Sequence, residues 1–144
     1  MRTSSKRSLF VAAASIAFAS ACAAVPLEGT TWRATAIHDG RGTAAALLPD
    51  TEITMTFGTD GRVAGTAGCN RYTARYLAEG STLRIDSAAL TRMACLRPGV
   101  MEQEQAFVDA LATVTTARVD GDQLELRRAD GTPAVTLRRA DDTE

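Results

Sequence analysis

The side chains that could perform catalysis in this chain are few. There is one histidine, His38, one lysine, Lys6, and three cysteines, Cys22, Cys69 and Cys95. A single histidine excludes paired-histidine metal sites, and the cysteines match no zinc-ligand spacing. We therefore expect no metal site and no cofactor.

An acid–base role for His38 would require a nucleophile beside its ring. Asp39 follows it in a glycine-rich segment, and the candidate nucleophiles are Ser81, Ser87 or a thiol. The sequence alone does not bring any of them to the ring. A small periplasmic hydrolase that uses His38 is therefore kept as an alternative only.

Glu102 and Glu104 are the candidates for a paired-carboxylate site. Both fall in the segment 101–114, where Phe107 and Leu111 recur at helical spacing and predict one amphipathic helix. Residues two apart on a helix point roughly 200° apart, so the two carboxylates cannot converge on one substrate. We expect ordinary first-turn acids that interact with the helix dipole, and no catalytic residues.

The overall charge excludes one class of partner. The chain carries 16 Lys plus Arg against 17 Asp plus Glu in 144 residues. Because no cationic excess is available to neutralise phosphates, we expect no nucleic-acid partner. The length is typical of a single domain.

The N-terminal segment has the features of an export signal. Its first eight residues carry three cations and no acid, and residues 9–19 form an uncharged apolar run that is too short to cross a membrane. The small residues before Cys22 resemble the lipobox of bacterial lipoproteins. We expect a signal peptide over 1–21, a membrane anchor through lipid on Cys22, and a linker over 22–26.

A second outcome of export stays open. Ala19-Ser20-Ala21 also satisfies the A-x-A rule of ordinary signal peptidase, which would release a soluble periplasmic or secreted protein. If Cys22 is lipidated, Ala23 after it favours an outer-membrane anchor facing the periplasm. In that oxidising compartment we expect a disulfide between Cys69 and Cys95, worth about 3 to 4 kcal/mol for a loop of about 27 residues.

Short runs with a period of two residues, separated by Gly and Asp, dominate the remaining sequence. They are typical of a meandering antiparallel sheet, with a tight turn at 58–61 and a loop over 38–46. The predicted strands are 31–37, 53–57, 62–68, 83–85, 88–93, 116–119, 124–126 and 135–137. About seven to eight strands and one helix indicate a β-dominated α+β fold, which we expect to close into a barrel-like shape around or against the helix.

Two blocks of sequence resemble a known family when taken together. They are Gly-Cys-Asn-Arg-Tyr at 68–72 and Thr-Arg-Met-Ala-Cys at 91–95, preceded by Leu-Glu-Gly-Thr-Thr-Trp at 27–32. These blocks resemble the META domain family, and we place that domain at 27–139. The sequence departs from the family pattern at Ala74, where many members have glycine.

The resemblance implies a compact, β-rich, barrel-like fold with a helix, found in exported or outer-membrane lipoproteins. It also implies links to envelope stress, and in some members to motility or drug tolerance, without an established enzymatic activity. The family-motif residues outside the disulfide are Gly68, Asn70, Arg71, Tyr72, Thr91, Arg92 and Met93.

These motif residues divide into structural and exposed ones. We expect Asn70 to satisfy backbone groups near the disulfide, Tyr72 to pack in the core, and Arg71 to lie exposed, where a partner could contact it. Thr91 and Met93 should share the inner face of a strand, with Arg92 on the other face. Trp32, the only tryptophan, is expected to anchor the core.

Function follows as a set of alternatives. We expect a non-enzymatic exported lipoprotein that supports envelope integrity or stress tolerance by binding an unidentified envelope protein or a small apolar ligand. The first alternative is a periplasmic binding module or chaperone that holds an acyl chain or a peptide in a groove between sheet and helix. An unfilled apolar cavity would favour that alternative.

Overall fold

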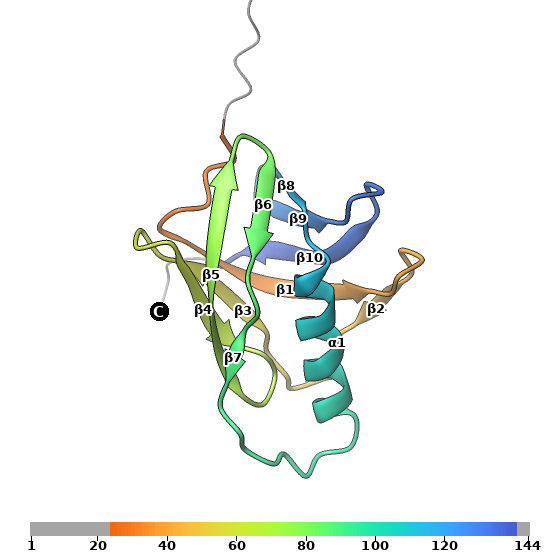
Figure 1. The fold of residues 1–144 in the computed structure, drawn as a ribbon. Coiled ribbons are helices and arrows are strands. Elements are labelled where there is room, and N and C mark those ends of the chain that lie inside the picture. The colour runs from red at the N-terminus through yellow and green to blue at the C-terminus, as the bar shows by residue number, and fades with distance from the viewer. Residues whose placement is uncertain (1–23, 141–144) are drawn as a thin grey trace, which may run out of the picture.

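The structure is a computed structural model, and it describes residues 24–140. These residues form ten strands and one helix, α1 (Val100–Ala112), which follows β7 in the chain (Figure 1). The strands are β1 (Thr30–His38), β2 (Ala44–Ala46), β3 (Thr54–Phe57), β4 (Arg62–Thr66), β5 (Arg71–Glu79), β6 (Thr82–Ile85), β7 (Ala89–Leu90), β8 (Thr116–Asp120), β9 (Gln123–Arg127) and β10 (Pro133–Arg139).

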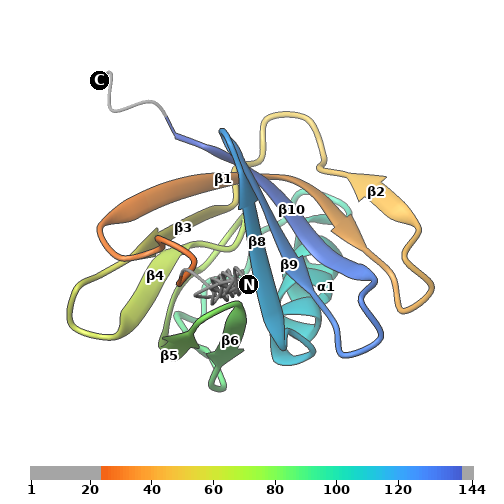
Figure 2. The ribbon, with the colours of Figure 1, turned by 90° about the horizontal axis from the view of Figure 1, so that it is seen from above.

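The strands form one antiparallel sheet that closes on itself. Its order is β10-β9-β8-β6-β5-β4-β3-β1-β2, with β7 on β5 and with a further pairing of β10 to β1. Seen from above, the strands form a ring, and β2 projects from it beside β1 (Figure 2). The helix packs against β1 and β10. The predicted β-dominated α+β fold with one helix is confirmed.

The strand count exceeds the predicted seven to eight because the prediction missed two strands. β5 begins in the first motif block, where no strand was predicted, although its buried residues Tyr72, Ala74 and Tyr76 alternate with less buried ones. β2 lies within the predicted loop. The predicted strand over 88–93 is reduced to β7. The Thr91 N–H still donates to the Arg71 carbonyl of β5, but both backbone polar groups of Met93 bind the Asn70 side chain.

Large apolar side chains from the sheet and the helix fill the interior. Trp32, Phe57 and Phe107 are all fully buried, and the rings of Phe107 and Tyr72 pack edge to face with centroids 5.4 Å apart. The indole Nε1 of Trp32 donates to the Thr30 hydroxyl over 2.7 Å. Trp32 is therefore a core anchor, as predicted.

Ala74 occupies an ordinary extended position in β5, opposite Val63 of β4. Among the described residues, Asp50 is the one non-glycine with a positive φ angle. The glycine found at position 74 in many family members is therefore not required by the backbone of this chain.

Candidate functional site

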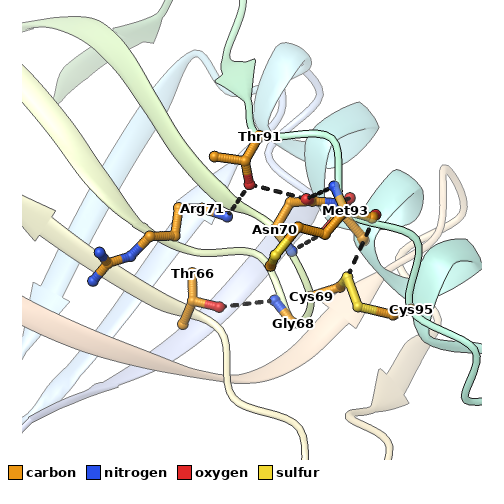
Figure 3. Close-up of a disulfide and its surroundings, with 9 residues drawn as sticks. Thr66, Gly68, Cys69, Asn70, Arg71, Thr91, Met93 and Cys95 are labelled. Carbon is orange, nitrogen blue, oxygen red and sulfur yellow. Dashed lines mark hydrogen bonds between the residues drawn. A yellow bond between two sulfur atoms is a disulfide. The ribbon is translucent and has the colours of Figure 1, made fainter.

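The disulfide joins the two motif blocks. Cys69 and Cys95 are bonded, with Cα atoms 6.1 Å apart, which confirms the predicted pairing (Figure 3). The first block covers the end of the β4–β5 connection and the first two residues of β5, and the second block follows β7. Gly68 has a φ of 107°, a conformation that glycine adopts without the penalty of a side chain.

Asn70 holds the two blocks together through its side chain. Its Oδ1 accepts from the Thr91 hydroxyl at 2.9 Å and from the Met93 N–H at 2.7 Å. Its Nδ2 donates to the Met93 carbonyl at 3.2 Å and to a carboxylate oxygen of Glu104 at 2.8 Å. All four hydrogen-bonding positions of the amide are used, so the expected structural role of Asn70 agrees with its geometry.

Glu104 differs from the prediction of an ordinary first-turn acid. Its side chain is only 5% exposed, and its second carboxylate oxygen accepts from the Asn70 backbone N–H at 2.6 Å. Glu104 thus links α1 to Asn70 of the first block, which in turn binds the second block, whereas Glu102 is exposed in the first helical turn, as expected. Helical spacing could have predicted the burial of Glu104, because it lies three residues before Phe107 and seven before Leu111, on the buried face of α1.

Tyr72 and Arg71 lie on opposite faces of β5. Tyr72 is buried, its hydroxyl donates to the Thr54 carbonyl at 2.8 Å, and burial raises the pKa of its phenol far above the ordinary value. Arg71 is exposed, and its side chain points away from Asn70 (Figure 3). Both positions agree with the expectations from sequence.

Thr91 and Met93 do not point into the core, so that prediction was wrong. Both are exposed, Met93 to 55%, and neither belongs to a strand. Pairing with β5 ends at the Thr91 N–H, because the N–H and carbonyl groups of Met93 bind the Asn70 side chain instead. Arg92 between them is also exposed, so residues 91–93 form one exposed segment next to the disulfide.

His38 is the last residue of β1, and among the described residues its ring is not hydrogen-bonded to any of the candidate nucleophiles. Its Nδ1 lies 3.1 Å from the Gly42 carbonyl, and its Nε2 lies 3.3 Å from the Thr136 hydroxyl. No hydrogen bond within residues 24–140 joins His38 to Ser81 or Ser87, and both thiols near the motif are in the disulfide. The hydrolase alternative gains no contact from this geometry.

A groove of about 600 Å³ lies between the β1–β2 hairpin and α1. Small and apolar side chains dominate its walls. The lining residues are Ile37, His38, Asp39, Gly40, Thr43, Ala44, Ala45, Ala46, Leu48, Gly99, Gln103, Ala106, Asp109, Ala110, Thr113 and Arg128. Its size falls within the usual range for ligand sites. The groove lies where the first alternative expected one, between sheet and helix.

Gln103 of α1 binds the segment that follows β2, which forms one wall of the groove. Gln103 accepts from the Leu48 N–H at 2.7 Å and donates to the Thr51 hydroxyl at 3.0 Å. The helix contributes Ala106, Ala110 and Thr113 to the opposite wall, at spacings that share one helical face. The sequence carries little signal for this wall, because these residues are too small to produce a strong apolar pattern.

The charges around the groove have different partners. Asp39 accepts from the backbone N–H groups of Thr43 and Arg41, and these bonds hold the pKa of its carboxyl below the ordinary aspartate value. Asp109 accepts from the Gln105 amide at 2.8 Å. Arg128 donates to the Pro133 and His38 carbonyls. Its guanidinium is therefore tied to the protein backbone, while the two carboxylates face solvent.

Two further features concern metal binding and membrane-spanning helices in the described part of the chain. Within residues 24–140, no group of three or more His, Cys, Asp or Glu is arranged to hold a metal ion. The same residues include no helix that is both long and apolar enough to cross a membrane. The predicted signal peptide and Cys22 lie outside the described residues.

The chain is similar to known domains over most of its length. A profile of the META domain matches residues 25–141, and none of the curated proteins matches significantly. A protein from Burkholderia xenovorans, solved by NMR, is 30% identical, with a TM-score of 0.65 over 79% of this chain and 83% of that one.

Two further solved structures share the fold. One NMR structure is 20% identical, with a TM-score of 0.61 over 82% of this chain and 95% of the other. A crystal structure of a DUF4847 family protein from Bacteroides vulgatus is 15% identical, with a TM-score of 0.54 over 81% and 97%. The profile match spans most of the chain and includes both motif blocks joined by the disulfide, so this chain belongs to the META domain family.

Proposed function

We propose that this protein is a non-enzymatic binding module of the cell envelope, exported and tethered through lipid on Cys22. It supports envelope integrity or stress tolerance by holding an envelope partner in the groove between the β1–β2 hairpin and α1. The observation that carries this proposal is the groove itself, with about 600 Å³ of space between small and apolar walls.

The groove has the features of a preformed binding site. One wall belongs to the sheet, and the other is α1. Hydrogen bonds of Glu104 with Asn70, and of Gln103 with Leu48 and Thr51, hold this helix in place. Because both walls are fixed before a partner arrives, little conformational entropy is lost on binding. The disulfide and the Asn70 network then serve as the support of the helix.

Site-specific photocrosslinking tests the groove in the living cell that makes the protein. The photoreactive residue p-benzoylphenylalanine replaces Ala106, which lines the groove, or Ala112, which is exposed on α1 outside it. We expect a covalent adduct to a cell-envelope component from position 106 and none from position 112. No adduct at 106, or equal adducts from both positions, would contradict the proposal.

The tether has a separate test. Radiolabelled palmitate should label the wild-type protein, while the Cys22→Ala variant should stay unlabelled. Equal label on the two proteins would refute Cys22 as the anchor, and absence of label from both would leave the soluble form.

A further inference from the structure

We propose that the groove takes an extended polypeptide segment of an envelope protein, which adds to the free edge of β2 as a new strand between β2 and α1. The segment carries apolar side chains at alternate positions and a basic residue next to them. This inference rests on the function proposed above and specifies the chemistry of the partner.

The edge of β2 offers unpaired backbone groups to the groove. β2 is the last strand in the sheet order and pairs with β1 alone. The Asp39 N–H donates to the Thr43 carbonyl at 3.0 Å, so Asp39 and Thr43 form a hydrogen-bonded pair of this hairpin. In an antiparallel ladder the bonded pairs alternate, so Ala45 bonds to β1, and Ala44 and Ala46 direct their N–H and C=O groups away from it.

This edge lacks the usual protection against strand addition. Exposed edge strands are commonly blocked by lysine, proline or a bulge. All three residues of β2 are exposed alanines, and all three line the groove. An added strand would lie roughly 4.8 Å from β2 and could form up to four backbone hydrogen bonds with Ala44 and Ala46.

The walls of the groove suit the side chains of an added strand. Successive side chains of a strand point to opposite faces, so every second one would enter the groove. There it would meet Ile37 and Leu48 on one side and Ala106 and Ala110 on the other. An acyl chain would also match these apolar walls, but it would displace water from the outward N–H and C=O groups of β2 without replacing their hydrogen bonds.

The exposed charges of the groove favour a basic residue in the partner. Asp39 and Asp109 are both exposed lining residues, and neither forms an ion pair within residues 24–140. Arg128 donates to two backbone carbonyls, and its charge and that of Arg41 also act on Asp39, so the preference for a basic residue rests on Asp109. A lysine or arginine near Asp109 would therefore meet an exposed carboxylate whose observed hydrogen bond comes from the neutral Gln105 amide.

Proline substitution on the edge tests strand addition. In the chain with p-benzoylphenylalanine at position 106, Ala46→Pro removes an outward N–H without breaking a bond to β1. Ala46→Ser keeps the N–H and is the matched control, and Ala44→Pro is the second variant should Ala46→Pro fail to fold by circular dichroism. Loss of an edge hydrogen bond together with steric obstruction should lower the yield of polypeptide adduct about tenfold or more. Ala46→Ser should stay close to the parent.

Amide exchange then locates the contact on the protein. A synthetic peptide copied from the crosslinked segment should slow exchange of the Ala44 and Ala46 amide protons by about tenfold or more at saturation. The Ala45 amide, which already bonds to β1, should change little and is the internal control.

Each other outcome overturns a defined part of the inference. An adduct to a lipid would exclude the peptide and leave the binding function intact. A polypeptide adduct that survives both proline substitutions would exclude strand addition, and an adduct to a second copy of this chain would replace the envelope partner by a dimer. Absence of any adduct at 106 would remove the proposed function as well.

Discussion

Replacing Glu104 by glutamine is expected to lower the free energy of unfolding by about 2 to 3 kcal/mol, although the two side chains have nearly the same shape. Both carboxylate oxygens of Glu104 accept hydrogen bonds from Asn70, one from its backbone N–H and one from its Nδ2. A glutamine offers one acceptor oxygen and an NH₂ group that would face a donor. One buried donor of Asn70 therefore loses its partner.

The magnitude follows from the chemistry of these two contacts. A buried donor without an acceptor costs about 1 to 3 kcal/mol, and the surviving hydrogen bond falls from a charge-assisted one to a neutral one, a loss of about 1 kcal/mol. The lower cost of burying an amide than a carboxylate offsets part of this loss. Glu104 is only 5% exposed, so water cannot restore the missing contact.

Glu102→Gln is the matched control, because it makes the same chemical change two residues away on an exposed side chain. Its loss should be limited to the helix-dipole interaction, about 0.3 to 1 kcal/mol. Urea unfolding of the disulfide-bonded proteins at neutral pH, followed by circular dichroism, measures both variants. In the Glu104→Gln protein, faster exchange of the Met93 amide should report loosening of the Asn70 side chain that binds it.

A double-mutant cycle decides whether the mechanism is correct. In an Asn70→Ala background, where the amide partner of Glu104 is absent, Glu104→Gln should cost at least 1 kcal/mol less than in the wild type. The reasoning would be refuted if Glu104→Gln destabilised the protein no more than Glu102→Gln, or if its effect were independent of Asn70.

Three further predictions concern the disulfide, a tyrosine and a glycine. Replacing Cys69 and Cys95 together by alanine should lower the free energy of unfolding by about 3 to 4 kcal/mol in urea, as the sequence separation of 26 implies; an unchanged midpoint would contradict it. Burial raises the pKa of Tyr72, so stability should fall as the pH rises above the ordinary tyrosine value of 10.0, and Tyr72→Phe should flatten that decline in urea titrations. Gly65→Ala should cost about 2 to 3 kcal/mol in thermal unfolding, because a Cβ there would overlap the Thr54 carbonyl oxygen. A variant as stable as the wild type would show that the strands can separate without cost.

Sequence patterns predicted the parts of the fold that depend on local order. Alternation identified β1, β3, β4 and the strands after the helix, and helical spacing located α1 to within two residues at each end. The thiol count predicted the Cys69–Cys95 disulfide. These predictions succeed because periodicity, turn residues and the two cysteines that remain beyond the predicted lipid anchor can be identified in the chain itself.

The missed features depend on which distant residues meet. Met93 was expected in the core, but its backbone N–H and carbonyl bind the Asn70 side chain, and its own side chain is exposed. Glu104 was expected at the surface, yet its helical face is covered by the motif blocks. A groove between sheet and helix was one predicted alternative, but the residues that line it were not predicted, because they come from residues 37–48 and 99–113 and from Arg128.

Sequence patterns were enough to predict α1, every strand except β2 and β5, the pairing of Cys69 with Cys95, the motif blocks of the META family and an export segment. The tertiary structure decided what those elements do to one another. In the folded chain, α1 packs against β1 and β10 and leaves the edge of β2 open beside the helix, and contact with Asn70 of the first motif block buries the Glu104 carboxylate. The physical reason is that burial and hydrogen-bond satisfaction are set by neighbours far apart in the chain, which local periodicity does not encode.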